Sequence, residues 1–84
     1  MQMASYEFYI HAYLNEEDEE ELKEVDELTV WEDGNISDEK ADKLLGEVIE
    51  KLGNGIVNYG YTNCADYHRL TIKDGNIVKT ETRF

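Results

Sequence analysis

The sequence predicts an α+β domain, with a mostly antiparallel sheet of four or five strands and one main helix packed on one face. Apolar residues recur at helical spacing over residues 38–52. Shorter stretches rich in β-branched and aromatic residues are separated by turns that contain glycine. The 84 residues fit a single domain over 1–84 with a thin core.

The first strand is expected over Ser5 to Leu14, where aromatic and aliphatic residues recur at every second position. One face of this strand should pack on the core, and it consists of Tyr6, Phe8, Ile10, Ala12 and Leu14. The other face is amphipathic and consists of Glu7, Tyr9, His11 and Tyr13. We expect this second face to meet solvent or a partner.

The main helix is expected over residues 38–52, because its apolar residues follow the helical period. Ser37 is a good N-cap, and Gly53 fits the position just after the last helical turn. Gly46 lowers the intrinsic stability of the helix, and we interpret it as a point of close packing on the sheet.

The other strands are recognised from their composition and from the turns between them. Asp33-Gly34-Asn35 and Asp74-Gly75 are turn signals. The expected strands cover residues 28–32, 55–62, 67–73 and 76–84. The order of these strands in the sheet does not follow from the sequence.

The most biased stretch of the chain is Asn15 to Glu27, in which nine of thirteen residues are carboxylates. These acids are Glu16, Glu17, Asp18, Glu19, Glu20, Glu21, Glu24, Asp26 and Glu27. The formal net charge of the chain is −12, and it is uneven: residues 1–50 carry −14 and residues 51–84 carry +2. Such a molecule should steer toward basic surfaces with its first half.

Within this stretch we predict a short acidic helix over about 16–25, with a loop as the alternative. Asn15 could cap such a helix, and acids in the first turn suit its dipole. Several like charges lie four residues apart, however, and each such pair costs a few tenths of a kcal/mol.

Metal and catalytic chemistry are not expected, and we predict a protein that is not an enzyme and has no cofactor. The acidic stretch lacks the central glycine of a calcium loop. Cys64, Asp66 and His68 lie close together in sequence and could be half a zinc site or a nucleophile with its base. A zinc site would need two more good ligands, so we interpret Cys64 as an ordinary thiol in a loop.

The charge and composition also exclude several classes of partner. Direct binding to nucleic acid is disfavoured because phosphates would be repelled. No apolar run is long enough for a membrane span, and the first residues do not resemble a signal peptide. The chain contains one cysteine, which fits a reducing compartment, so we expect a cytoplasmic protein.

The density of carboxylates suggests that they stand in for phosphates. As a helix, residues 16–27 would span ~18 Å, which gives about one acid per ~2 Å. Duplex DNA carries one charge per ~1.7 Å. We therefore predict that the chain occupies the basic groove of a nucleic-acid-binding protein, with Tyr9 and Tyr13 adding specific contacts beside the acids.

A small, strongly acidic α+β chain with an aromatic first strand (YEFYIHAYL) resembles phage-encoded DNA-mimic inhibitors, including anti-CRISPR proteins. The resemblance lies in size and charge over the whole chain and in no particular motif. It implies stoichiometric inhibition of a nuclease or CRISPR-Cas effector at its DNA-binding surface, in the cytoplasm of the phage's host. The positive second half departs from a uniformly acidic mimic, so either one face does the mimicry or neighbouring copies associate.

Two alternatives to this interpretation remain open at the level of sequence. The chain could be an immunity protein or antitoxin that neutralises a basic nuclease toxin by the same charge complementarity. It could also be a protein-interaction domain whose acidic stretch only keeps it soluble, because most charge runs are solvated surface. The chain could act as a monomer or as a homodimer.

Overall fold

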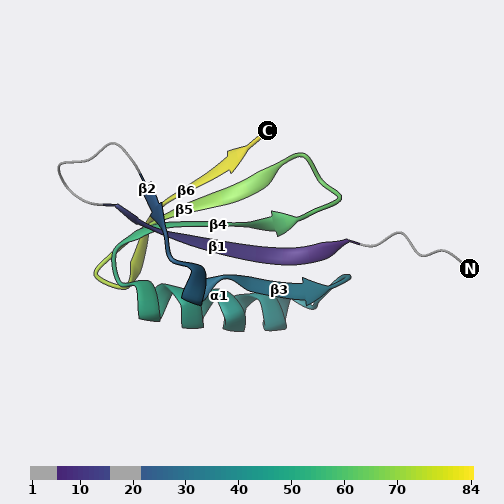
Figure 1. Cartoon of the computed structure of the whole chain (residues 1–84), viewed down its shortest axis with the longest axis horizontal. Coiled ribbons are helices and arrows are strands. Elements are labelled where there is room, and N and C mark those ends of the chain that lie inside the picture. The colour runs from purple at the N-terminus through teal and green to yellow at the C-terminus, as the bar shows by residue number, and fades with distance from the viewer. Residues whose placement is uncertain (1–5, 16–21) are drawn as a thin grey trace, which may run out of the picture.

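The computed structural model describes residues 6–15 and 22–84, which form one helix packed on a six-stranded sheet (Figure 1). The α+β class predicted from the sequence is therefore confirmed. The elements are β1 (Glu7–Asn15), β2 (Leu22–Glu24), a 3-10 helix (Asp26–Leu28), β3 (Val30–Asp33), α1 (Asp38–Leu52), β4 (Gly55–Tyr61), β5 (Tyr67–Lys73) and β6 (Asn76–Arg83). No helix in the described part of the chain is long and apolar enough to cross a membrane.

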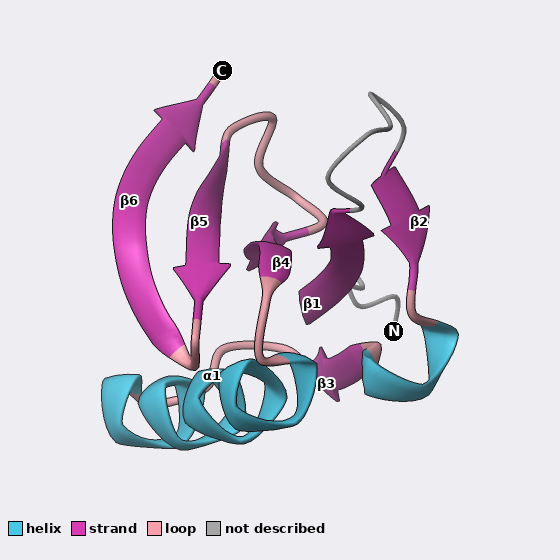
Figure 2. Cartoon of the chain, turned by 90° about the vertical axis from the view of Figure 1, so that its left-hand side faces the viewer, coloured by secondary structure: helices cyan, strands magenta, loops and turns pink. Residues whose placement is uncertain are grey.

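The sheet is organised around β1, and every strand pair in it is antiparallel. Its order is β2-β1-β4-β5-β6, and β3 also pairs with β1. β2 pairs with the last residues of β1 and β3 with its first half, so the two short strands share one edge of β1. β4 takes the other edge, and the chain passes from β3 to β4 through α1 (Figure 2).

The core lies between the sheet and α1 and follows the alternation of β1. Phe8, Ile10 and Ala12 of β1 are at most 2% exposed, as their spacing predicted. They pack with apolar residues of α1, β4 and β5, namely Leu45, Val48, Ile49, Leu52, Val57, Leu70 and Ile72. Leu14 departs from the prediction because it lies near the end of β1 and is exposed.

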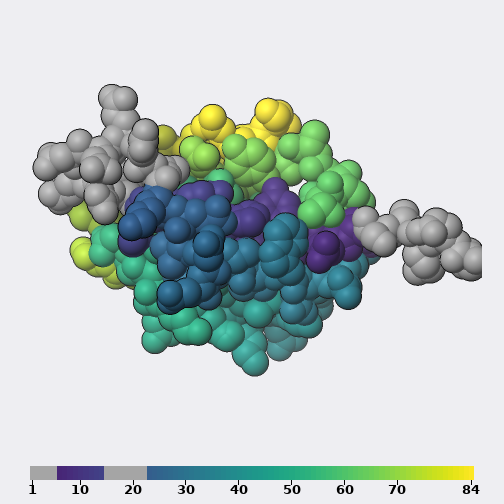
Figure 3. All heavy atoms as spheres, in the orientation of Figure 1, coloured from purple at the N-terminus to yellow at the C-terminus, as the bar shows by residue number. Residues whose placement is uncertain are grey.

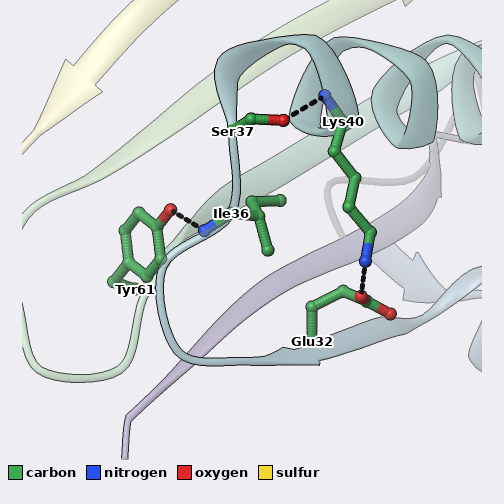
Figure 4. A network of polar contacts seen from close by, with 5 residues as sticks. All are labelled: Glu32, Ile36, Ser37, Lys40 and Tyr61. Carbon is green, nitrogen blue, oxygen red and sulfur yellow. Dashed lines mark hydrogen bonds and ion pairs between the residues drawn. The ribbon is translucent and has the colours of Figure 1, made fainter.

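The start of α1 is fixed by a small polar network (Figure 4). The Ser37 hydroxyl accepts a hydrogen bond from the Lys40 backbone N–H at 3.1 Å, which confirms Ser37 as the N-cap. The Ile36 N–H donates to the Tyr61 hydroxyl of β4, and the Lys40 ammonium pairs with Glu32 of β3. The start of the helix is thereby tied to β3 and β4, which lie on opposite edges of β1.

The end of α1 also matches its sequence signal. Gly53 has a φ of 76°, and its N–H donates to the Ile49 carbonyl at 2.9 Å. Gly46 does not match, because it is exposed on the helix and a Cβ placed there would meet no neighbour within 4 Å. The prediction that Gly46 marks close packing on the sheet is therefore wrong.

The expected acidic helix over 16–25 is not present in the part of that range that the structure describes. Residues 16–21 lie outside the described residues. Leu22–Glu24 form β2, a strand paired with β1, and Asp26–Leu28 form a separate 3-10 helix. Pairing with β1 outweighs the weak local preference of this acidic segment for a helix. The charge spacing of a continuous helix over residues 16–27 therefore does not apply.

Two glycine variants should change stability in opposite directions. Gly55 has a φ of 147°, and a Cβ there would lie 2.1 Å from the Tyr13 carbonyl oxygen of β1. Gly55→Ala should lower the free energy of unfolding by about 2 kcal/mol or more, because it combines backbone strain with a backbone clash. Gly46→Ala is the matched control and should raise it by about 0.5–1 kcal/mol. Urea unfolding followed by circular dichroism measures both, and equal effects would contradict this account.

Candidate protein-binding surface

The sequence analysis predicted eleven residues for partner binding, and the structure describes five of them. They are Tyr9, Tyr13, Glu24, Asp26 and Glu27. The other six, Glu16, Glu17, Asp18, Glu19, Glu20 and Glu21, lie outside the described residues. The candidate surface is therefore built from the face of the sheet opposite α1 and from the segment that follows β2.

The face of the sheet opposite α1 carries a cluster of rings that we call the aromatic face: Tyr9, His11, Tyr13, Trp31 and Tyr67. The register of the strands assembles it, because Tyr9 of β1 lies opposite Trp31 of β3. The rings of Tyr9 and Trp31 are 6.0 Å apart, and His11 meets Trp31 edge-on at 5.4 Å. Trp31 is 49% exposed, so a large ring remains available to a partner.

Gly60 makes room for this cluster on β4. It lies opposite Tyr9 in the sheet, and a Cβ at Gly60 would be 3.2 Å from the Tyr9 hydroxyl and 3.3 Å from Tyr67. A side chain at this position would therefore push against both tyrosines. The glycine within β4 lets Tyr9 lie across the sheet toward Tyr67.

The aromatic face is hollowed next to Asn58 of β4. Tyr9, His11, Tyr13, Asn58 and Tyr67 line a shallow hollow of about 220 Å³. The Asn58 side-chain carbonyl accepts a hydrogen bond from the Arg69 Nε of β5 at 3.1 Å, which fixes its orientation. The hollow thus presents ring faces, phenol hydroxyls and an amide, which suit contact with a polar or cationic side chain better than with an apolar one.

Three acids of the stretch from Asn15 to Glu27 are described by the structure, and they follow one another around the edge of the sheet. We call these residues, Glu24, Asp26 and Glu27, the acidic edge. Glu24 of β2 lies opposite Tyr13 and its carboxylate contacts the His11 Nδ1 at 3.0 Å, so it joins the aromatic face. Glu27 lies on the other side, where it lines a hollow with α1 residues. The space-filling view shows this segment (blue) against β1 (purple) (Figure 3). The acids therefore wrap around the edge and do not share one plane.

Among the described residues, no lysine or arginine side chain forms an ion pair with the acidic edge. Lys40 pairs with Glu32, while Lys79 and Arg83 pair with Glu81. None of these pairs involves Glu24, Asp26 or Glu27. These carboxylates are all exposed, and within the described part of the chain only that of Glu24 has a polar contact, to the His11 ring, so they are available to cations of a partner.

Across the open face the charge changes sign. The acidic edge lies at the β2 end of the sheet, where Lys23 is the one basic residue of the strand, and four basic residues lie on the strands at the other end, namely Arg69 and Lys73 of β5 and Lys79 and Arg83 of β6. The uneven charge of the two halves of the sequence therefore becomes a separation between two edges of one sheet. The aromatic face lies between them.

The second group that the sequence suggested, Cys64, Asp66 and His68, lines a different hollow near the start of α1, together with Asp38. Cys64 donates to the Asn63 side chain, and the His68 Nδ1 contacts the Thr82 hydroxyl, so the two do not form a nucleophile–base pair. Among the described residues, no group of three or more His, Cys, Asp or Glu side chains is arranged to hold a metal ion.

No protein-family profile matches this sequence, and no curated protein or solved structure is significantly similar to it.

Sequence reasoning placed Tyr9, His11 and Tyr13 on one face of the first strand but did not assign Trp31, Tyr67 and Asn58 to the same surface. The alternation within β1 was enough for the first three residues. The others depend on which strands are neighbours and in what register. Tyr59 and Tyr61, which have similar composition signals, instead pack against the core beneath the sheet.

Two tyrosines of the aromatic face, Tyr9 and Tyr13, have a pKa above the ordinary value and act as neutral, hydrogen-bonding phenols. Burial raises the pKa of Tyr9 above its ordinary value, and the neighbouring Tyr67 and Tyr13 raise it further. Burial also raises the pKa of Tyr13, with a second contribution from the charge of Glu24. The phenols therefore keep their protons in the folded protein to higher pH than in the unfolded chain.

These pKa shifts predict a loss of stability in alkali. Above the ordinary tyrosine pKa of 10.0, the unfolded chain releases these protons before the folded protein does, so the free energy of unfolding falls as pH rises. The double variant Tyr9→Phe/Tyr13→Phe should show a shallower decline. Urea unfolding at a series of pH values between neutrality and strong alkali measures this, and parallel curves for the two proteins would refute it.

Proposed function

We propose that this protein is an acidic inhibitor that binds the basic nucleic-acid-binding surface of a nuclease or CRISPR-Cas effector and excludes the nucleic acid. The observation that carries the proposal is an acidic edge without a lysine or arginine partner among the described residues, next to an aromatic face that exposes Trp31, on a chain of net charge −12. It binds without catalysing a reaction. The proposed setting is the cytoplasm of a cell that contains such an effector.

Charge provides the first contribution to binding. Surfaces that bind nucleic acid are lined with lysine and arginine, which neutralise phosphates and release counterions. Carboxylates of the acidic edge can take the same cations, and charge-assisted hydrogen bonds to arginine are among the strongest polar contacts. Because Glu24, Asp26 and Glu27 lie around an edge, they fit a concave basic groove better than a flat surface.

The aromatic face provides the second contribution, because charge alone gives fast association more than selectivity. A partner arginine that approaches Glu24 would also lie close to the Trp31 and Tyr9 rings, where its guanidinium can stack on a ring face. The phenol hydroxyls and the Asn58 amide then supply directional contacts. The combination favours an arginine-rich groove of one partner over basic proteins in general.

The immunity or antitoxin alternative uses the same surface and differs in the partner. A nuclease toxin would be blocked at its catalytic cleft, whereas an effector would be blocked where it first engages DNA. Affinity capture from cell lysate with the immobilised protein, at low and high salt, separates these cases. The proposed function requires one nucleic-acid-binding protein that is lost as salt rises and is displaced by duplex DNA. Recovery of only abundant basic proteins would overturn it.

Neutralising the acidic edge should weaken binding more than removing the same charge elsewhere. The variant Glu24→Gln/Asp26→Asn/Glu27→Gln should bind the captured partner about 10-fold to 100-fold more weakly, since each lost charge pair is worth about 1 kcal/mol. The matched control Glu39→Gln/Asp42→Asn/Glu50→Gln removes three exposed acids from α1 and should change affinity much less. Isothermal titration calorimetry measures both, and equal losses would show that only net charge matters.

Trp31 should contribute a large share of the binding free energy. Trp31→Ala should cost about 2 kcal/mol of binding free energy, or roughly 30-fold in the dissociation constant, as is usual for an exposed tryptophan anchored in a ring cluster. Phe84→Ala is a suitable control because Phe84 is also an exposed aromatic residue but lies at the end of the chain beyond β6. If both variants bind like the parent protein, the aromatic face is not part of the interface.

A further inference from the structure

The edge of the sheet opposite the acidic edge is formed by β6, and it is long and exposed. Within residues 6–15 and 22–84, β6 pairs with β5 alone, and Figure 2 shows it at one end of the sheet. All its residues except Glu81 are exposed, including Ile77 at 51% and Val78 at 58%. Such an edge offers unpaired backbone groups to another strand.

The two edges of the sheet differ in how they are protected. The edge at β1 carries two short strands, β2 and β3, which are separated by a 3-10 helix and leave little continuous backbone for pairing. β6 has eight residues, and the chain contains no proline that would interrupt it. Its bulge is at Val78, near the beginning of the strand, and leaves Lys79–Arg83 in regular register with β5.

We propose that β6 pairs with β6 of a second copy of this chain, in an antiparallel arrangement centred on Thr80. In that register Lys79 of each copy lies directly opposite Glu81 of the other, on the open face of both sheets. The dimer therefore places two Lys79–Glu81 pairs across the strands, one on each side of its two-fold axis, in addition to the Lys79–Glu81 pair within each chain. The two sheets join into one continuous sheet with a helix beneath each half.

Neighbouring registers are less favourable for reasons of charge and length. In a register centred on Lys79, the Lys79 side chains of the two copies lie opposite each other. In a register centred on Glu81, the two Glu81 side chains lie opposite each other, and Lys79 lies opposite Arg83. Like charges directly opposite each other destabilise a strand pair. A centre on Thr82 pairs Glu81 with Arg83, but only residues 81–83 of the strand overlap. The centre on Thr80 combines complementary charge with an overlap over residues 77–83, in which residues 79–81 pair regularly and the bulge at Val78 lies opposite Thr82.

This dimer is independent of the proposed inhibitory function. β6 and the acidic edge lie at opposite ends of the sheet, so pairing through β6 leaves Glu24, Trp31 and the rest of the aromatic face open. The dimer would carry two acidic edges at its far ends. Each proposal can therefore fail without the other.

Charge reversal tests the proposed register directly. Sedimentation equilibrium over a wide concentration range should give a mass that approaches twice the 9.8 kDa of the chain. Lys79→Glu or Glu81→Lys alone places two like-charge pairs across the axis and should raise the dissociation constant of the dimer about 10-fold or more. The double variant Lys79→Glu/Glu81→Lys restores opposite charges and should recover the parent's dimerisation.

The control is Lys73→Glu, which makes the same change of charge at the end of β5, away from the pairing edge. It should leave the dissociation constant of the dimer unchanged. Circular dichroism should show the same fold for all four variants, since the exchanged side chains are at the surface. A monomer mass at every concentration would overturn the proposal, and so would a double variant that dimerises no better than the single ones.

Discussion

The structure depends above all on β1, which is paired on both edges and buried on one face. Its inward residues Phe8, Ile10 and Ala12 are the centre of the core, and α1 can pack on the sheet only because this apolar row is continuous. Its outward residues Tyr9, His11 and Tyr13 form the middle of the aromatic face. A shift of β1 by one residue would exchange these two sets, so the register of this strand fixes the core and the candidate surface together.

Elements with strong local signals were predictable from the sequence, and those that depend on distant partners were not. α1 has a serine cap, an apolar period and a terminal glycine, and the structure begins and ends it where these signals lie. β2 has no such signal, because Leu22–Glu24 is short and charged. It is a strand because β1 offers free backbone groups at that edge, a tertiary effect that local preference does not contain.

The candidate surface was predictable to a similar extent. Alternation in β1 indicated that Tyr9 and Tyr13 face away from the core, and composition marked the acids. What could not be predicted is the contact of Glu24 with His11 and the turn of Glu27 toward α1, because both follow from how the chain leaves β2. Gly60 is a related case: its role is visible only when β4 is known to lie beside β1.

In the proposed interface the acidic edge and the aromatic face have different physical tasks. A surplus of carboxylates at one edge sets up a long-range field that speeds encounter with a basic partner, and salt screens that field over about 10 Å at 0.1 M ionic strength. The rings of Tyr9 and Trp31 act only at contact, where salt has little influence. For the proposed complex we expect the association rate to fall with ionic strength while the dissociation rate stays nearly constant, because the acids would control the approach and the aromatic face the lifetime of the complex.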